Sequence, residues 1–404
     1  MTEILRPQTA DDTRDLLAWA VSEQKPLEIV GNGTKRGFGH PVAASHSLDL
    51  SGLSGIVEYE PAELVLTARA ATPISEIEAL LRQSNQQLAF EPPDLGPLYG
   101  AQAERATLGG IVAGNLSGPR RVQTGAARDH TLGVQVATGR GELIKAGGRV
   151  VKNVSGYDLT KLMCGSWGTL GVLTQISIKV LPAPEKTRTV LIAGQDAADA
   201  CLAMTAALSS PHEVSAAAFL PAPIAARSRV SYVAGAGASV TAIRIEGPPV
   251  SVSVRNTALR DLLSAFGDIE ELHGHNSGAL WQEVRDATPF SSGDSVLWRL
   301  SVAPASGGAV LDALGDLGIE GYLDWGGGLI WASSGEDNEH AHQVRTLSES
   351  AGGHATLVRA PEVLKSAIGV FHPQPATRDG LSQRIKDGFD PNGILNPGRM
   401  VQGA

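Results

Sequence analysis

A glycine-rich segment that leads into strand-like sequence constrains the fold of this chain more than any other part. The segment runs from Gly147 to Pro182 and reads GGRVVKNVSGYDLTKLMCGSWGTLGVLTQISIKVLP. Glycine lacks a Cβ, so it permits positive φ and lets a ligand or another backbone approach closely. Four such residues fall close together: Gly156, Gly165, Gly168 and Gly171. The apolar run from Val172 to Val180 then predicts a buried strand.

Two interpretations of this segment remain open at this point. A tight turn before a core strand would explain each glycine separately. The clustering of the glycines, together with the polar neighbours Lys152, Asn153 and Asp158, favours a loop that lines a ligand.

Length and charge indicate a two-domain globular protein. The chain has 404 residues, and a single core usually stops growing below that size. Its formal net charge of -9 argues against nonspecific nucleic-acid binding, which needs a basic face. The N-terminus lacks the apolar core of a signal peptide, and no stretch is long enough to span a bilayer. We therefore expect a cytoplasmic protein without direct membrane insertion.

The sequence argues against metal sites and disulfide bonds. Cys164 and Cys201 are the only cysteines, which excludes a cysteine-ligated iron-sulfur cluster within the chain and makes a disulfide framework implausible. None of the ten histidines forms an H-E-x-x-H motif. We expect no metal site.

Upstream of this segment, a first glycine-rich loop follows a predicted strand, Leu27 to Val30. It comprises Gly31, Asn32, Gly33, Thr34 and Lys35. Consecutive backbone amides in such a turn form a concave anion site, with a hydroxyl from Thr34 and charge from Lys35 or Arg36. The P-loop and dinucleotide fingerprints both fail here, so a Walker or Rossmann assignment is disfavoured. The loop nevertheless predicts phosphate binding.

The second loop rich in glycine spans Thr107 to Asn115, with sequence TLGGIVAGN. Thr107 and the amides of Gly109 and Gly110 could hold a second phosphate, while small Ala113 keeps a short helix close to the ligand. A tightly packed glycine helix is the alternative.

The order of these motifs resembles the FAD-binding domain of the vanillyl-alcohol oxidase and p-cresol methylhydroxylase superfamily. GNGTK, TLGGIVAGN, a predicted hairpin (LGVQVATGRGELIKAGG) and the opening glycine segment occur in that order. DGFDPNGILNPGRM, Asp387 to Met400, resembles the sequence that closes FAD-linked oxidases. SGPRRVQTGAARD, YLDWGGGLIW and AGGHAT are most similar to the FAD-binding E subunits of bacterial glycolate oxidases.

The resemblance implies an α+β protein with a defined domain plan. Residues 1–183 would form a two-subdomain FAD-binding domain of the p-cresol methylhydroxylase type. Residues 184–375 would form an α+β, ferredoxin-like antiparallel cap domain, and residues 376–404 would return to the FAD domain. Alternating strand-like and helix-like patterns in the second half agree with this plan.

The resemblance also implies a set of cofactor-binding residues. Gly31 to Lys35 and Thr107 to Asn115 would grip the FAD pyrophosphate, with Ser117 and Gly118 beside them. The elongated flavin site would be lined by Gly168, Gly171 and Val172, and Asn396 would approach the isoalloxazine. Trp167 stands where many relatives have glutamate. Covalently flavinylated relatives have histidine in the first loop, where this chain has Lys35 and Arg36, so we expect noncovalent FAD.

The second half of the sequence contains few candidate catalytic or binding residues. Several residue types suited to anchoring carboxylates or partner proteins occur there: Trp281, Arg285, Trp298, Arg299, Asp324 and Trp325. His354 could lie near the flavin and relay a proton. Core packing or structural ion pairs are the alternative for each of them.

We expect an FAD-binding subunit of a glycolate oxidase complex that oxidises glycolate, a small 2-hydroxy acid, to glyoxylate. A homologous flavoprotein subunit would perform the alcohol oxidation, and an iron-sulfur subunit would accept electrons; these partners could also associate the chain with a membrane. One alternative is a self-sufficient FAD-dependent 2-hydroxy-acid dehydrogenase, with His354 as base and Arg285 or Arg299 holding the carboxylate. Another is a flavin-free structural subunit.

Overall fold

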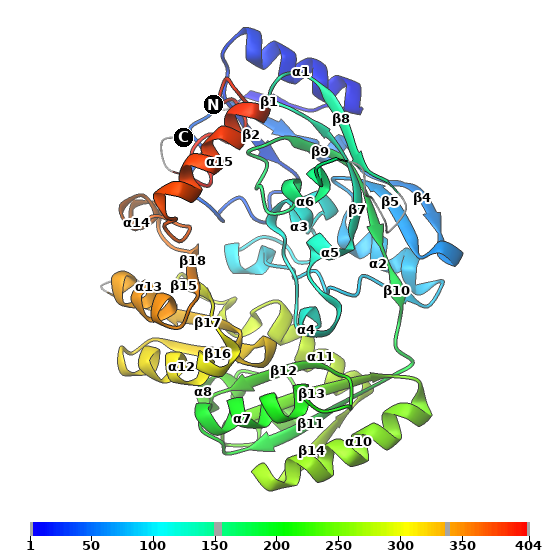
Figure 1. The fold of residues 1–404 in the computed structure, drawn as a ribbon, viewed down its shortest axis with the longest axis vertical. Coiled ribbons are helices and arrows are strands. Elements are labelled where there is room, and N and C mark those ends of the chain that lie inside the picture. Colours follow the sequence, from blue (N-terminus) through cyan, green and yellow to red (C-terminus); the bar gives the residue numbers. More distant parts are fainter. Residues whose placement is uncertain (1–2, 149–155, 336–339, 402–404) are drawn as a thin grey trace. The chain divides into compact units, whose positions relative to one another are not determined.

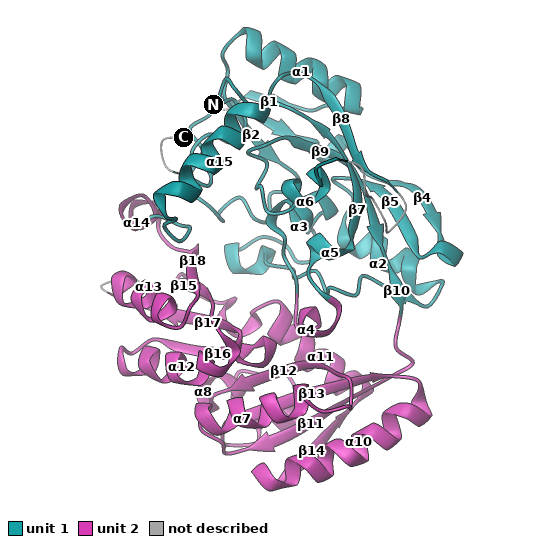
Figure 2. Cartoon of the chain, viewed as in Figure 1, with its two compact units in different colours: residues 1–117, 125–182, 369–404 teal, residues 118–124, 183–368 magenta. Residues whose placement is uncertain are grey.

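The chain divides into two compact units in the computed structural model, which describes residues 3–148, 156–335 and 340–401. Residues 1–117, 125–182 and 369–404 form the first unit, and residues 118–124 and 183–368 form the second (Figure 2). This division differs from the expected domain plan in three places. The returning segment begins at residue 369 rather than 376, residues 118–124 belong to the second unit, and the first unit ends at residue 182 rather than 183. Lys152 and Asn153 of the opening glycine segment lie outside the described residues.

The first unit begins with a parallel three-stranded sheet in the order β1-β3-β2. Its strands are β1 (Glu3–Leu5), β2 (Leu27–Val30) and β3 (His46–Asp49), and helix α1 (Ala10–Ser22) follows β1. A capping box starts this helix, because the Thr9 hydroxyl accepts from the Asp12 amide while the Asp12 carboxylate accepts from the Thr9 amide. Leu17 and Ala20 on α1 are fully buried in the core beside Leu48 of β3.

A five-stranded antiparallel sheet, in the order β4-β5-β9-β7-β8, forms the rest of the first unit. Its strands are β4 (Ile56–Glu60), β5 (Val65–Arg69), β7 (Thr131–Ala137), β8 (Leu143–Gly147) and β9 (Val172–Lys179). The predicted apolar strand after the glycine segment is β9, paired with both β5 and β7. Smaller elements are α2 (Ile74–Arg82), α3 (Leu108–Gly114), α5 (Ala127–His130), α6 (Leu159–Met163), and the paired β6 (Gln86–Gln87) and β10 (Leu181–Pro182).

The C-terminal segment returns to the N-terminal sheet of the first unit. Helix α15 (Ala376–Phe389) precedes it, and Figure 1 shows α15, in red, near the blue strands β1 and β2. Leu395 then pairs with Leu27 of β2 in a parallel bridge. Buried Asp390 fixes the turn in between, since its carboxylate accepts from the Ile394 and Leu395 amides and from Lys386 Nζ.

The second unit contains two ferredoxin-like halves joined edge to edge in one antiparallel sheet. The first half runs β11 (Lys186–Ala193), α7 (Ala197–Leu208), β12 (Val214–Leu220), β13 (Val240–Gly247), α10 (Pro249–Leu263) and β14 (Ile269–His273). The second half runs β15 (Val296–Ser301), α12 (Gly307–Asp316), β16 (Glu320–Asp324), β17 (Leu329–Ser334), α13 (Ala341–Ser350) and β18 (His354–Arg359). The strand order is β14-β11-β13-β12-β16-β17-β15-β18. Each half therefore has the βαββαβ order of the expected ferredoxin-like domain.

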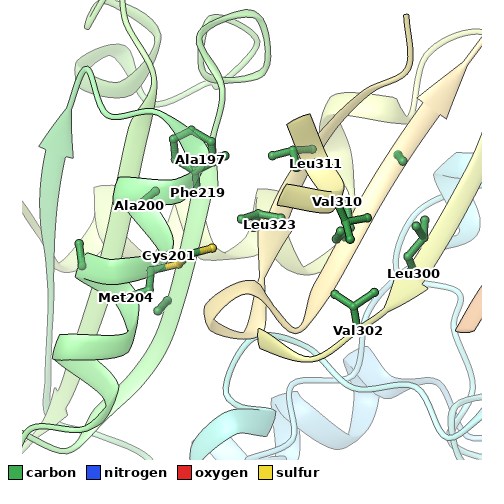
Figure 3. Packing of buried hydrophobic residues seen from close by; sticks show 14 of the residues in the cluster. Ala197, Ala200, Cys201, Met204, Phe219, Leu300, Val302, Val310, Leu311 and Leu323 are labelled. Atoms are coloured by element: carbon green, nitrogen blue, oxygen red, sulfur yellow. The ribbon is translucent and has the colours of Figure 1, made fainter. Parts of the chain in front are cut away.

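The helices of both halves share one hydrophobic core on one face of this sheet. Alternate residues of β15 point into it, namely Val296, Trp298 and Leu300, so Arg299 lies on the opposite face. Figure 3 shows α7 residues such as Cys201 and Met204 facing Leu311 and Leu323 of the second half. Remaining helices of the unit are α4 (Arg121–Thr124), α8 (Ala222–Ala225), α9 (Ser231–Ala234), α11 (Gly274–Arg285) and α14 (Glu362–Ile368). Within the described ranges, no helix is both long and apolar enough to cross a membrane.

Candidate functional site

A pocket in the first unit collects residues from all three glycine-rich segments and from the C-terminal return. Its lining comprises Ile29, Val30, Gly31, Asn32, Gly33, Thr34, Lys35, Arg36, Leu50, Ala70, Ala71, Thr107, Gly109, Gly110, Ala113, Trp167, Gly168, Gly171, Leu173, Asn396 and Arg399. Most of the predicted cofactor-binding residues therefore lie together, although they come from distant parts of the sequence.

The loop after β2 exposes an array of backbone donors to this pocket. Among the described residues, the amides of Asn32, Gly33, Thr34 and Lys35 donate to no protein acceptor. Gly33 has φ +74°, a conformation that glycine adopts without cost. Successive amides with a left-handed residue among them form a concave anion site. The structure thus supports the phosphate-binding hypothesis for this loop.

Lys35 adds a half-buried positive charge at the same place. Its Nζ lies 3.1 Å from the Thr34 hydroxyl and forms no ion pair with any residue that the structure describes. Burial lowers the pKa of Lys35 to about 8, and the Asp94 carboxylate opposes this shift only in part. An ammonium that is partly removed from water and forms no ion pair is costly, so an anionic ligand would supply the missing charge.

The second loop differs from its prediction in how its amides are used. Thr107 N-caps α3 by accepting from the Gly110 amide at 3.2 Å. The Gly109 amide donates to the Ala70 carbonyl at 2.7 Å. Neither amide is therefore available for a phosphate, which corrects the expectation from sequence. Gly109 instead permits close packing, because a Cβ there would lie 2.8 Å from the Ala70 oxygen.

The opening glycine-rich segment and the C-terminal return meet at Asn396. Its Oδ1 accepts from the Ile29 amide at 2.8 Å, and its Nδ2 donates to the Trp167 carbonyl at 2.8 Å. Both Asn396 and Trp167 have positive φ, which asparagine tolerates better than tryptophan. Asn396 thus holds β2 and the turn before Gly168 together along one wall of the pocket.

Arg399 is a pocket residue that the motifs did not single out. Its Nη1 donates to the carbonyl oxygens of Arg36 and Phe38, each at 2.9 Å, so it fixes the end of the first loop. Burial lowers the pKa of the Arg399 guanidinium. The C-terminal NPGRM sequence was the signal that could have identified it.

Trp167 forms an aromatic wall with two phenylalanines. Its ring centroid lies 4.4 Å from that of Phe38 and 6.0 Å from that of Phe371. Ala70 and Ala71, at the end of β5, were also not anticipated from sequence. They line the pocket because α3 packs closely against them.

Four residues predicted to contact the cofactor do not line this pocket. The Asn115 side chain accepts from the Arg128 amide, and the Ser117 hydroxyl accepts from the Ala127 amide. Val172 is buried in the hydrophobic core. Gly118 belongs to the second unit, where its carbonyl accepts from Trp325 Nε1.

The three candidate catalytic residues all belong to the second unit, and Arg299 and His354 lie on the paired strands β15 and β18. Arg285, at the end of α11, forms a two-pronged ion pair with Asp286. His354 is exposed at the start of β18. Arg299 lies on β15 beside the Trp325 ring. No group of three or more potential metal ligands occurs within residues 3–148, 156–335 and 340–401.

The pocket fits a dinucleotide cofactor. The open amides and Lys35 would hold a diphosphate, and the glycine and alanine positions leave room for an extended ligand. Trp167, Leu173 and Leu50 add apolar surface suited to aromatic rings.

Known proteins agree with this assignment. Residues 2–147 match the family model described as FAD binding domain. The fold is similar to 4-ethylphenol oxidase from Gulosibacter chungangensis and to p-cresol methylhydroxylase, each with a TM-score of 0.72 over 98% of this chain and 88% of that chain, at 14% and 15% identity. These likenesses confirm the predicted fold class and the FAD cofactor.

The site and the matching family model therefore define an FAD-binding protein, and its fold is similar to that of p-cresol methylhydroxylase. The glycolate oxidase subunit GlcE of Escherichia coli (strain K12) is 40% identical over 386 residues, 94% of each chain. This chain belongs to the family of that subunit. The glycolate oxidase subunit GlcD of Bacillus subtilis (strain 168) is 28% identical over 222 residues, 55% of this chain and 44% of that protein.

Proposed function

We propose that this chain is an FAD-binding subunit of a glycolate oxidase complex, in which it assists electron transfer or assembly beside a homologous, catalytic flavoprotein subunit. The overall reaction removes two electrons and two protons from glycolate to give glyoxylate. The similarity to proteins named as two different subunits, GlcE and GlcD, supports a complex that contains related flavoproteins. An iron-sulfur subunit is the proposed electron acceptor.

The observation that carries this proposal is the chemistry of the pocket lining. It has open amides and the half-buried Lys35 for a diphosphate, but no histidine, aspartate or glutamate lines it among the described residues. Alcohol oxidation needs a group that accepts the hydroxyl proton. A pocket built from cations and small residues supports cofactor binding by this chain and proton abstraction by another.

The proposed attachment of FAD is noncovalent. Lys35 and Arg36 occupy the loop where covalently flavinylated relatives have histidine, and Arg36 is engaged in a two-pronged ion pair with Glu28. Acid precipitation of the yellow protein should leave all flavin in the supernatant. Flavin that remains in the precipitate would contradict this assignment.

Coexpression of the chain with and without its neighbouring genes tests the proposed function. We expect the isolated chain to carry flavin but to reduce no dye with glycolate, and the copurified complex to reduce dye. Glycolate-dependent dye reduction by the isolated chain would instead establish a self-sufficient dehydrogenase. A colourless chain that rejects added FAD would establish a structural subunit.

A further inference from the structure

A second pocket lies within the second unit, where the strands β11 and β14 meet the helix α10 (Figure 1). Its cavity measures about 240 Å³, and pockets for drug-sized molecules span roughly 300–1,000 Å³, so it suits a smaller ligand. Lys186 and Arg188 of its lining share a strand face with Val190, which is buried in the core under the helices. The pocket therefore lies on the helix-covered face of the sheet.

The charged side chains of this pocket do not balance. Lys186, Arg188 and Arg260 are cations at neutral pH. Among the described residues that line the pocket, Glu271 is the single carboxylate. The lining thus has two more positive than negative charges, even with His273 neutral.

The Glu271 carboxylate is already fully engaged by its neighbours. Its Oε1 lies 2.9 Å from Arg188 Nε and 3.1 Å from His273 Nε2. Its Oε2 accepts from Asn256 Nδ2 at 2.8 Å and lies 3.5 Å from Arg260 Nη1. A carboxylate offers about four lone-pair sites, so Glu271 has none left for a further cation.

Lys186 and Arg260 keep donors that this network does not use. Lys186 is half-buried at the start of β11 and forms neither an ion pair nor a side-chain hydrogen bond with any described residue. The Arg260 side chain is 46% exposed and donates no hydrogen bond to the part of the chain that the structure describes. Both cations can therefore bind an anion that enters the pocket.

Asn256 supplies a buried acceptor that lacks a donor. Its Nδ2 bond to Glu271 fixes the orientation of the amide, because the reverse orientation would place Oδ1 against a carboxylate. Asn256 is 8% exposed, and its Oδ1 has no hydrogen-bond partner among the described atoms. A buried acceptor without a donor costs about 1–3 kcal/mol. A ligand that carries a hydroxyl beside its negative charge would supply the missing donor.

We propose that this pocket binds a phosphate group, with Lys186 and Arg260 as its charge partners. A phosphate group carries a charge of about −1.5 to −2 near neutral pH and has three strong acceptor oxygens, which matches the excess charge and the separate donors on β11 and α10. Ser253 and Thr257, one turn apart on α10, add two hydroxyls beside Arg260. The hydroxyl of hydrogen phosphate, or of an alcohol that carries the phosphate as an ester, would donate to Asn256.

Calorimetric titration of the purified, flavin-loaded full chain tests the inference, because bound FAD keeps the probes from the loop amides of the first unit. The probes are sodium phosphate, glycerol phosphate and sodium acetate, each at the same ionic strength. We expect saturable binding of a phosphate compound and none of acetate. Binding of phosphate alone would support a site for the free ion, and binding of glycerol phosphate alone would support a site for an ester. Failure of both phosphate compounds, or equal binding of acetate, would overturn the site.

Variants of the two cations locate the binding event. Lys186→Gln should weaken phosphate binding by about tenfold or more, because a charge-assisted hydrogen bond is lost. Arg260→Gln should also weaken it, by about fivefold or more. Arg227→Gln is the matched control for Arg260→Gln, since the side chain of Arg227 is 40% exposed and also lies beside a glutamate, Glu320. Its phosphate affinity should stay within about twofold of the wild type.

The outcome that contradicts the assignment is equally specific. Equal losses in Arg260→Gln and Arg227→Gln, or no loss in Lys186→Gln, would overturn the site.

A measurement on the wild type keeps the inference testable if a variant does not fold. A lysine-acetylating reagent modifies accessible ammonium groups, and peptide mapping by mass spectrometry reports the rate at each position. The phosphate compound that binds should slow the acetylation of Lys186 while leaving Lys145, an exposed residue of β8, unchanged. Acetylation of Lys186 at the same rate in that compound and in sodium chloride of equal ionic strength would overturn the site.

Discussion

The glycine-rich loop after β2 and the glycine-rich loop that forms α3 both line the pocket, but their hydrogen-bond arrangements differ. In the Gly31–Lys35 loop, the amides from Asn32 onward have no protein acceptor among the described residues. In the Thr107–Asn115 loop, the Gly109 and Gly110 amides already donate to the Ala70 carbonyl and the Thr107 hydroxyl. The first loop is thus arranged to bind an anion, whereas the second is arranged to bring two backbones together.

This difference shows why glycine content alone does not identify a phosphate site. A backbone amide must donate somewhere, either to protein, to water or to a ligand. The inventory of those donors separates the two loops, and variants at each loop should separate them in solution.

The largest effect should come from removing the charge of the first loop. Lys35→Met should weaken FAD binding by about 2–3 kcal/mol, because a hydrogen bond between charged groups is lost. The comparison is a fluorescence titration of apoprotein with FAD. Lys35→Arg keeps the charge and should bind within about fivefold of the wild type. Equal weakening in both variants would show that the shape of the side chain matters, not its charge.

The same variant should stabilise the protein without its cofactor. Lys35 has a pKa of about 8 in the folded protein and 10.5 as its ordinary value, so folding disfavours its charged form. This penalty is fully present below pH 8 and disappears as the pH rises toward 10.5. The apoprotein of Lys35→Met should therefore unfold at higher denaturant concentration than the wild type at pH 7, with a smaller difference at pH 10.

The second loop should respond to added volume rather than to lost charge. Gly109→Ala places a Cβ 2.8 Å from the Ala70 oxygen and should lower the free energy of unfolding by about 2 kcal/mol. Chemical denaturation of the apoprotein measures this effect. Gly278→Ala, in α11, is the matched control because no atom lies within 4 Å of its added Cβ. That variant should be as stable as the wild type or slightly more so, and similar losses in both would contradict the packing role of Gly109.

Much of the fold could be predicted from local sequence patterns. The β7–β8 hairpin and strand β9 follow from apolar alternation and turn residues. Strand β14 has a weaker local pattern, because its sequence, IEELH, carries charge at the edge of a sheet. Its carboxylate Glu271 is stabilised by Arg188 and Arg260 from other elements, and such long-range pairs leave no local signal.

The candidate site likewise contains residues that local sequence predicts and residues that depend on long-range contacts. Glycine motifs predicted Gly31 to Lys35 and Gly168 because those positions depend on local backbone conformation. The availability of the Gly109 amide depends on Ala70, a residue from another element, so the sequence could not reveal it. The convergence of Lys186, Asn256 and Arg260 on one pocket likewise requires the tertiary structure.

A smaller effect should appear in the pH dependence of FAD binding. A bound diphosphate raises the pKa of Lys35 above its value of about 8, because an opposite charge favours the ammonium form. Binding therefore takes up a proton above pH 8. FAD affinity should be constant below that pH and decrease above it, by at most roughly tenfold per pH unit. Lys35→Arg should remove this decrease, and the same slope in that variant would assign the titration to another group.

The smallest effect should distinguish backbone conformation from packing within the first loop. Gly33 has φ +74°, yet the nearest atom to an added Cβ is Val30 Cγ1 at 4.0 Å. Gly33→Ala should therefore cost only the strain of a left-handed residue, about 1 kcal/mol in the free energy of unfolding of the apoprotein. Gly33→Asn should cost less, because asparagine tolerates this conformation. If Gly33→Asn destabilised the protein more than Gly33→Ala, side-chain volume would limit the first loop as it limits the second, and the contrast between the two loops would be lost.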